Sequence, residues 1–234
     1  KRIKRQLRST QRRILLRFVG AFGTTSTMAP LVVFGVWPLD LQIRFRGALY
    51  WLKKQNFEKV YNTIGNRVYS RSEIKQALLT EWQVEWNTIQ EGRRTHGIFP
   101  SVRQRLRLRH LRPGQGLVHF LTGHGPYGVY FKRINSIEDD SCEICEIPDT
   151  PEHAVFECVR SLGLEVDARN RLTNHTIREI ILNENLFKDL SRLTDSFSKS
   201  ARENRPDAQR TRRHFTINED VDTRRSQRLQ NREH

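Results

Sequence analysis

One segment decides how the middle of this chain folds: CEICEIPDTPEHAVFEC, residues 142–158. It contains four potential metal ligands in the pattern Cys-x2-Cys-x7-His-x4-Cys, namely Cys142, Cys145, His153 and Cys158. Two cysteines so close together can face one ion from a short turn. Thr150-Pro151-Glu152 then favours a helix start, with a threonine cap and a proline in the first helical position. Three thiolates and one imidazole make a closed tetrahedral set, so the segment predicts a structural zinc site.

Two metal-free interpretations of this segment are weaker. Three reduced, buried cysteines beside an unrelated histidine would need no metal, but all three cysteines of the chain lie in this one window. An odd number of closely spaced cysteines also argues against a disulfide framework. A Cys–His nucleophile would need an orienting carboxylate or an oxyanion-stabilising feature, and none stands out.

Composition restricts what surrounds the segment. Of the 234 residues, 36% are hydrophobic, the mean hydropathy is -0.68 and the formal net charge is +15. This hydrophobic content supports a modest core. The large positive charge favours a protein that binds a polyanion, and a soluble basic protein without such a partner is the weaker interpretation. We expect a mainly α fold, with helical segments around a small zinc knuckle and a disordered basic C-terminal tail.

Hydrophobic periodicity divides the chain further. It predicts helices that reach about Phe22, span 29–34, begin at Pro38, run from Ser70 to Gly92, and cover 176–182 and 186–197. The expected domains are a helical segment at 1–55, a helical and arginine-rich connector at 56–137, the cysteine motif at 138–160, C-terminal helices at 161–200 and the disordered tail at 201–234.

Two tryptophans share one face of the long predicted helix. Trp82 and Trp86 are four residues apart, so they point the same way. They could form a stacking platform for bases, but two core tryptophans are the more common use of such a pair.

Arginines are concentrated in two places without nearby acids. In the stretch 101–112 their alternation fits a strand with one basic face, while part of the set also fits a helical stripe. The second place is an N-terminal arm, residues 1–13. Positive charge of this density suits contacts to backbone phosphates. The predicted nucleic-acid contacts are Arg103, Arg105, Arg107, Arg109 and Arg112, with Arg5, Arg8, Arg12 and Arg13 from the arm.

The cysteine segment itself is acidic. Residues 134–159 contain no lysine or arginine, but they contain eight acids. This surface should repel phosphate, so we expect the knuckle to hold the fold together and to position the arginines before it. The pair Asp139-Asp140 has polar neighbours and no flanking strand, which indicates solvated charge and no catalytic metal site. The glycine-punctuated stretch 121–128 lacks the lysine of a phosphate loop and favours a structural turn.

These stretches together resemble a known family. QRRILLR at 11–17, GVWPLDL at 35–41, the turn at 121–127 and TPEHAVFEC at 150–158 occur in the order found in the C-terminal part of the pol polyprotein of non-LTR retrotransposons. The resemblance covers about residues 7–200 and is strongest to the type-1 elements of arthropod ribosomal DNA. It implies that the cysteine segment is the gag-like cysteine motif of that family.

The resemblance also implies a parent with an endonuclease and a reverse transcriptase, which nicks target DNA and copies its RNA from the nick. Because the chain begins with lysine, we expect a fragment whose catalytic domains, and their magnesium, lie upstream. The expected partners are RNA, target DNA and the upstream reverse transcriptase domain. Two alternatives are a free-standing zinc-knuckle module that binds a protein through its acidic face, and a fragment with nuclease activity of its own.

The sequence also bears on location. The longest apolar stretch, Met28 to Leu39, is interrupted by Pro30, Gly35 and Pro38 and is shorter than the ~20 residues of a membrane span. We therefore expect no membrane partner and an intracellular, nuclear protein.

Overall fold

The computed structural model describes residues 2–203 of the chain, which divides into two compact units, Lys1–Ser198 and Lys199–His234. The description below concerns the first unit. The disordered tail expected at 201–234 lies almost entirely outside the described residues. Within the described part the fold is mainly α, as predicted, and its one β-bridge pairs Ser141 with Pro148.

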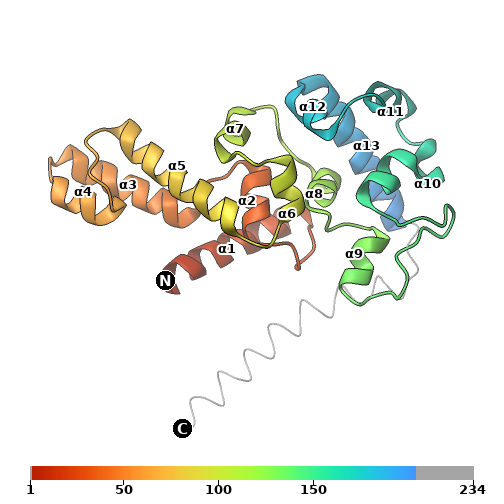
Figure 1. The fold of residues 1–234 in the computed structure, drawn as a ribbon, viewed down its shortest axis with the longest axis horizontal. Coiled ribbons are helices and arrows are strands. Elements are labelled where there is room, and N and C mark those ends of the chain that lie inside the picture. The colour runs from red at the N-terminus through yellow and green to blue at the C-terminus, as the bar shows by residue number, and fades with distance from the viewer. Residues whose placement is uncertain (1, 204–234) are drawn as a thin grey trace, which may run out of the picture. The chain divides into compact units, whose positions relative to one another are not determined.

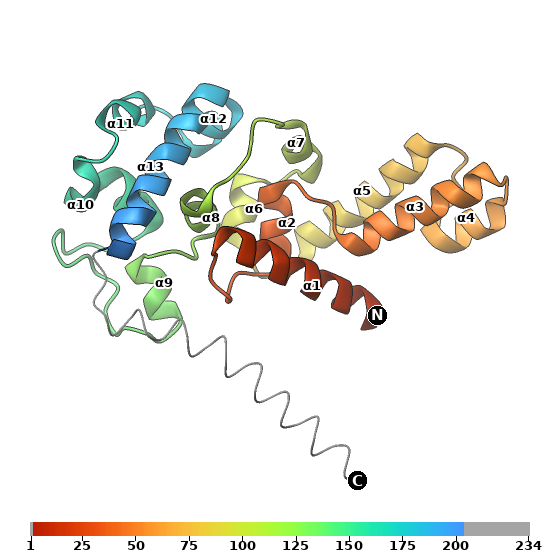
Figure 2. The same cartoon turned by 180° about the vertical axis from the view of Figure 1, so that it is seen from behind.

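Thirteen α-helices and one π-helical turn follow one another in the described residues (Figures 1 and 2). Their bounds are α1 Arg2–Val19, α2 Met28–Phe34, α3 Leu39–Lys53, α4 Phe57–Ile64, α5 Arg71–Thr88, α6 Arg93–Ile98, α7 Val102–Arg107, α8 Gln115–Thr122, α9 Gly128–Arg133, η1 His153–Glu157, α10 Val159–Leu162, α11 Val166–Leu172, α12 Ile177–Leu182 and α13 Glu184–Glu203.

Helix α2 is the centre of the N-terminal half. Six of its seven residues are buried, and it contacts α1, α6, α7 and α8. The hydroxyl of Ser26 accepts a hydrogen bond from the amide of Ala29 at 3.2 Å, and Gly35 ends the helix in the left-handed conformation. The helix thus ends at the predicted residue and begins one residue before the predicted start, because a hydroxyl satisfies the first amides and glycine tolerates positive φ.

A buried ion-pair network fixes α1 to this half. Arg8 on α1 donates to Asp40 on α3 at 2.6 and 3.0 Å and to Glu85 on α5 at 2.5 Å. Arg8 and Asp40 are both buried. Such a network costs desolvation but leaves a large penalty for removing one member, so it specifies how the three helices meet.

Helices α3, α4 and α5 form a projecting group at one end of the unit (Figure 1). Helix α5 begins at Arg71, directly after the predicted start at Ser70, which is its N-cap, and it ends at Thr88, before the predicted Gly92. Ile89 is extended there, and Gly92 instead precedes α6 in the left-handed conformation. Trp82 and Trp86 are fully buried, which confirms the core interpretation of this pair.

The second half is organised around α8 and α13. Helix α8 is buried along nearly its whole length. At Gly116 the backbone of α8 lies directly against that of α13, because a Cβ there would lie 2.1 Å from the carbonyl oxygen of Thr194. The amide of Gly116 also donates to Asp195 at 2.8 Å. A residue without a side chain is therefore required where these two helices meet.

Within residues 2–203, no single helix combines the length and apolarity needed to cross a membrane. Helices α2 and α3 reach them only as a pair, with a 65° bend between them.

Candidate metal centre and arginine surfaces

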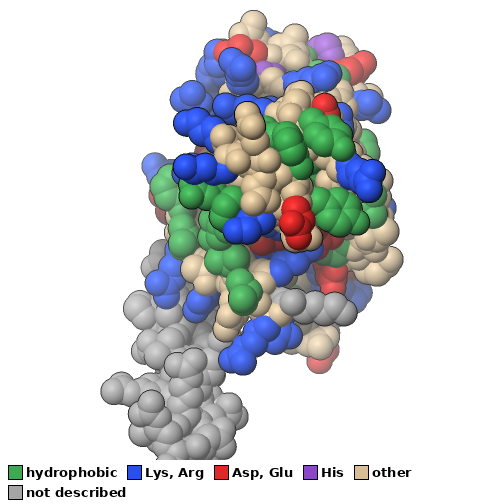
Figure 3. All heavy atoms as spheres, turned by 90° about the vertical axis from the view of Figure 1, so that its left-hand side faces the viewer, with side chains coloured by type: hydrophobic (Ala, Val, Ile, Leu, Met, Phe, Trp, Pro, Cys, Tyr) green, Lys and Arg blue, Asp and Glu red, His purple; other side chains and the backbone are tan. Residues whose placement is uncertain are grey.

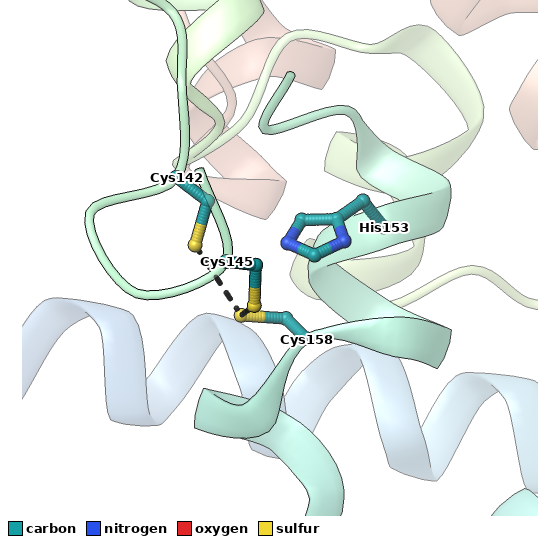
Figure 4. A group of neighbouring side chains, drawn as sticks. All are labelled: Cys142, Cys145, His153 and Cys158. Atoms are coloured by element: carbon teal, nitrogen blue, oxygen red, sulfur yellow. Dashed lines mark hydrogen bonds between the residues drawn. The ribbon is translucent and has the colours of Figure 1, made fainter. Parts of the chain in front are cut away.

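The four residues of the cysteine motif come together in the structure (Figure 4). Their potential ligand atoms all lie within 4.8 Å of one another. The Sγ atom of Cys158 lies 3.6 Å from that of Cys142 and 4.0 Å from that of Cys145. A tetrahedral ion with metal–sulfur bonds of about 2.3 Å would have sulfur–sulfur edges of about 3.8 Å, so the thiols already have the spacing of such a site.

The imidazole of His153 supplies independent support for a metal. The side chain is buried, and neither ring nitrogen has a hydrogen-bond partner within the described residues. A buried polar atom without a partner is costly unless something unseen satisfies it. A metal ion bound to the three thiols would satisfy one of the two ring nitrogens, and the residues therefore fit a closed metal site.

A tight turn presents the first two cysteines. The amide of Cys142 donates to the carbonyl of Ile147 at 2.8 Å, and the amide of Glu146 donates back to Cys142 at 2.9 Å. Glu146 has a φ of 56°, which closes the turn. Burial raises the pKa of the Cys142 thiol, but hydrogen bonds from the amides of Ile144 and Cys145 outweigh burial, and the pKa falls to about 6. The thiolate, which is the metal-binding form, is thereby favoured.

A π-helical turn presents the other two ligands. The chain enters a helix at Pro151 behind the predicted cap, whose hydroxyl accepts from the amide of His153 at 3.1 Å. The helix then widens at His153–Glu157, and the amide of Cys158 donates to the carbonyl of His153 at 2.7 Å. The sequence predicted only the cap and the helix start. The wider turn is what places the side chains of His153 and Cys158 on the same side.

Arg160 contacts the site and was not singled out from the sequence. Its Nε donates to the Sγ of Cys158 at 3.1 Å, and its Nη2 donates to Asp149 at 2.5 Å. Burial lowers the pKa of Arg160, but the bond to Cys158 and the charge of Asp149 outweigh this and raise it. Three thiolates and a divalent ion carry a net negative charge, which this guanidinium balances. In the sequence, the feature that could have identified Arg160 is its position as the first basic residue after the acidic cysteine segment.

Asp149 connects the motif to the glycine turn before it. Its other carboxylate oxygen accepts from the amide of Gly128 at 2.9 Å. A Cβ on Gly128 would lie 2.6 Å from the carbonyl oxygen of Asp140 and 3.0 Å from the Cβ of Asp149. The stretch 121–128 is thus buried and closely packed, as a structural turn should be, and α8 ends there at Gly123.

The acids of the motif lie mainly on its surface. Among them, Asp139 accepts from the amide and hydroxyl of Ser141, and Asp140 pairs with Lys132 at 2.7 Å. These contacts belong to a loop, and the two carboxylates do not form a site of their own. The other exposed or half-exposed acids are Glu138, Glu143, Glu146, Glu152 and Glu157.

The arginines expected to contact phosphate in the stretch 101–112 divide into two kinds. Arg107, Arg109 and Arg112 are exposed, and Arg103 is half-exposed. Arg105 is buried, with 4% of its surface exposed. The stretch is neither one helix nor a strand, because α7 ends at Arg107 and irregular chain follows.

Arg105 has a structural role in place of the expected phosphate contact. Its Nη2 donates to the carbonyl of Val33 at 2.6 Å and to that of Leu111 at 3.1 Å, and its Nη1 donates to Leu108 at 3.2 Å. It thereby satisfies carbonyls at the end of α2 and in the loop after α7. Burial lowers its pKa to about 10, so it stays charged at neutral pH.

The N-terminal arm divides in the same way. Arg5 and Arg13 are exposed, whereas Arg8 belongs to the buried network with Asp40 and Glu85. Arg12 is half-buried and donates to the carbonyl of Thr25 at 2.7 Å. We therefore assign Arg8 a structural role, as we do Arg105. The arm is also part of a folded helix, α1, which lies on the opposite side of α2 from α7 (Figures 1 and 2).

Comparison with known proteins finds relatives of the chain among proteins of type-1 retrotransposable elements. It is 27% identical over 162 residues to the Retrovirus-related Pol polyprotein from type-1 retrotransposable element R1 4 of Nasonia vitripennis, which covers 66% of this chain and 41% of that protein. It is 29% identical over 142 residues to the corresponding R1 2 polyprotein of the same species, covering 58% of this chain and 35% of that one.

A third relative is the Putative 115 kDa protein in type-1 retrotransposable element R1DM of Drosophila melanogaster, 30% identical over 154 residues, which cover 62% of this chain and 15% of the relative. The chain thus spans about two fifths of the length of the first relative, or less of the others. No protein-family model matches the chain, and no solved structure matches it. The chain is a relative of the Pol polyproteins of type-1 retrotransposable elements.

Proposed function

We propose that this relative of retrotransposon Pol polyproteins is a nucleic-acid-binding segment that follows the catalytic domains of such a polyprotein. The parent would be an RNA-directed DNA polymerase with an endonuclease, acting in target-primed reverse transcription in the nucleus. In this role the segment holds RNA or target DNA while the upstream domains, with their magnesium, nick and copy. The names of the relatives support the parent, and the surface of the segment supports the binding role.

One observation carries the binding role. Arg107, Arg109 and Arg112 are exposed one after another where α7 ends, and no carboxylate of residues 2–203 lies within ion-pair distance of them. The exposed Arg178 of α12 lines a shallow hollow together with Leu108, which lies between Arg107 and Arg109 in the chain. Unpaired guanidinium groups are the natural partners of phosphate oxygens.

The metal in this proposal is zinc, held by Cys142, Cys145, His153 and Cys158. Four protein ligands leave no open position, so zinc would contribute stability to the fold and take no part in a reaction. The acidic surface of the motif is unsuited to phosphate, and the motif serves to hold α9, η1 and α10 in place. Arg107, Arg109, Arg112, Arg103, Arg5 and Arg13 remain the proposed phosphate contacts.

Salt-dependent binding tests this function. Fluorescence anisotropy with labelled RNA and DNA should give affinities that fall with added salt, with a logarithmic slope of about -0.7 to -0.9 for each phosphate contacted. The triple variant Arg107→Gln/Arg109→Gln/Arg112→Gln should weaken binding and make the slope shallower. Lys188→Gln is the matched control, because it removes a base that is already paired with Glu184 on α13.

The outcomes also separate the alternatives. Affinity that ignores salt, or a triple variant with the wild-type slope, would contradict the phosphate contacts. A chain that binds no nucleic acid but captures a protein through its acidic motif would favour the free-standing interaction module. Metal-dependent nicking by the purified chain would favour a nuclease.

A further inference from the structure

Large aromatic side chains are exposed on the projecting group formed by α3, α4 and the link to α5. We call the set of Tyr50, Trp51, Phe57, Tyr61 and Tyr69 the aromatic tip. Tyr50, Phe57, Tyr61 and Tyr69 are 54%, 45%, 49% and 62% exposed, while Trp51 is half-buried. Exposed aromatic rings gathered on one part of a protein usually mark a binding surface.

The rings lie on both flanks of α4. On one flank, the ring centroids of Phe57 and Tyr69 are 5.5 Å apart, and Tyr61 follows Phe57 one turn along the same face of the helix. On the other flank, the rings of Tyr50 and Trp51 are 4.8 Å apart, and the Nζ of Lys59 lies 3.9 Å from the Trp51 ring centroid.

The surroundings of the aromatic tip are strongly basic. Residues 44–75 contain eight bases, Arg44, Arg46, Lys53, Lys54, Lys59, Arg67, Arg71 and Lys75, against two acids, Glu58 and Glu73. Glu73 is already occupied in capping α5, where it accepts from the amide of Tyr69 at 2.8 Å. Figure 3 shows this end of the molecule, where hydrophobic side chains alternate with lysines and arginines and few acids lie between them.

The scaffold under the aromatic tip is well fixed. Arg44 on α3 pairs with Glu81 on α5 at 2.6 Å, and its Nε donates to the carbonyl of Thr63 near the end of α4 at 3.0 Å. One side chain thus joins all three helices. Asn56 caps α4 by accepting from the amide of Lys59 at 3.0 Å. The rings are therefore held on a preformed surface, which reduces the entropic cost of binding.

We propose that the aromatic tip binds single-stranded nucleic acid, with unpaired bases stacked on Tyr61, Tyr69 and Tyr50 and with the surrounding lysines and arginines on the phosphates. A basic groove or surface with interleaved aromatic rings is the chemistry of sequence-tolerant single-strand binding. A duplex does not fit, because its base faces are covered by neighbouring pairs. An acid-poor surface with net positive charge selects a polyanion over an apolar protein face. The inference rests on the proposed function and gives it a second contact surface, away from α7.

The experiment compares single strands with a duplex. The zinc-loaded full chain is titrated against fluorescein-labelled oligouridylate, oligothymidylate and duplex DNA of the same length. Tyr61→Ala/Tyr69→Ala should weaken binding of the single strands by about tenfold or more for each stacking interaction removed, and leave the salt slope and duplex affinity unchanged. Tyr61→Phe/Tyr69→Phe keeps both rings and should retain wild-type affinity. Val166→Ala removes an exposed apolar residue of α11 as a control.

Charge and location have separate readouts. Lys53→Gln/Lys54→Gln should make the single-strand salt slope shallower by about 0.7 for each phosphate that a removed lysine would neutralise. Photo-crosslinking with 4-thiouridine in the oligonucleotide should label the tryptic peptides that contain Tyr61 and Tyr69. Comparing the affinities for single-stranded RNA and single-stranded DNA of equal length shows which of these two nucleic acids the aromatic tip prefers.

Three outcomes would overturn the inference. Unchanged single-strand affinity in the double alanine variant would show that the rings of the aromatic tip do not bind the single strand. Equal loss of duplex binding would exclude stacking on unpaired bases, and crosslinks confined to residues 101–112 would place the single strand elsewhere. If the triple variant at Arg107, Arg109 and Arg112 loses affinity while the tip variant does not, the proposed function stands and the proposal for the aromatic tip fails. If the wild-type chain binds nothing, both fail.

Discussion

The backbone amide of Cys158 donates to the carbonyl oxygen of His153 at 2.7 Å, across five residues. In an α-helix, residues five apart point about 140° away from each other, so a regular helix would carry these two side chains on different sides. The wider π-helical turn, with fewer degrees of rotation per residue, reduces this difference. The spacing His-x4-Cys is thus matched to an irregular turn that itself forms half of the metal site.

Loss of one thiol should cost both the metal and stability. Cys158→Ser is expected to abolish stoichiometric zinc and to lower the unfolding temperature by about 10 °C, because structural zinc contributes several kcal/mol to folding. Metal content by elemental mass spectrometry and thermal unfolding with and without a chelator measure this. Ile144→Ser changes an exposed residue of the same turn and should leave both quantities unchanged. An unfolding temperature of the wild-type chain that does not change with the chelator would contradict the structural zinc site.

Substitution of the buried Arg105 and of the exposed Arg109 should have different effects on stability and on nucleic-acid binding. Arg105→Ala removes the guanidinium donor from the carbonyls of Val33 and Leu111, so we expect a loss of about 3 kcal/mol in unfolding free energy. Arg109→Ala should change stability by less than about 0.5 kcal/mol and should weaken nucleic-acid binding. Denaturant unfolding measures the first effect and anisotropy the second. Equal stability of the two variants would refute the division.

The contact between α8 and α13 should tolerate no added atom at Gly116. Gly116→Ala places a methyl group against the backbone of Thr194, so we expect a destabilisation of about 3 kcal/mol. Gly47→Ala is the opposite control, because Gly47 lies inside α3 with open space around it. That change should stabilise the protein by up to about 1 kcal/mol. Thermal unfolding of the two variants should therefore shift in opposite directions.

A buried carboxylate makes part of the stability depend on pH. Asp189 on α13 accepts from Arg171 on α11 at 2.7 and 2.8 Å, and these bonds lower its pKa. A depressed folded-state pKa stabilises the fold above the unfolded value of about 3.9, and that contribution disappears as the pH falls further. Asp189→Asn should thus cost about 1 to 2 kcal/mol at pH 7 and progressively less below about pH 4. Urea unfolding at both pH values tests this; a pH-independent difference would contradict it.

Much of the fold could be predicted from local signals. Ser26, Gly35, Ser70 and the capping box of Thr176 with Glu179 mark helix ends by chemistry that acts within one turn. The four ligands were predictable for the same reason, because their spacing is short.

What the sequence could not supply depends on long-range packing. Arg105 and Arg107 look alike in the sequence, and only the position of α2 makes one a buried donor and the other an exposed base. The alternation of arginines in this stretch therefore carried no information about which of them face solvent. Likewise, the exposed rings of Tyr61 and Tyr69 follow no motif, whereas the paired Trp82 and Trp86 are buried.

Gly128 restricts which substitutions the chain can tolerate at neighbouring positions during evolution. It touches Asp140 and Asp149, and Asp149 in turn pairs with Arg160, which donates to Cys158. A larger residue at position 128 would have to shift the length of chain that carries Asp149, and with it the partner of Arg160. Positions 128, 149 and 160 should therefore vary together among relatives of this chain, and a change at one of them alone should destabilise the fold.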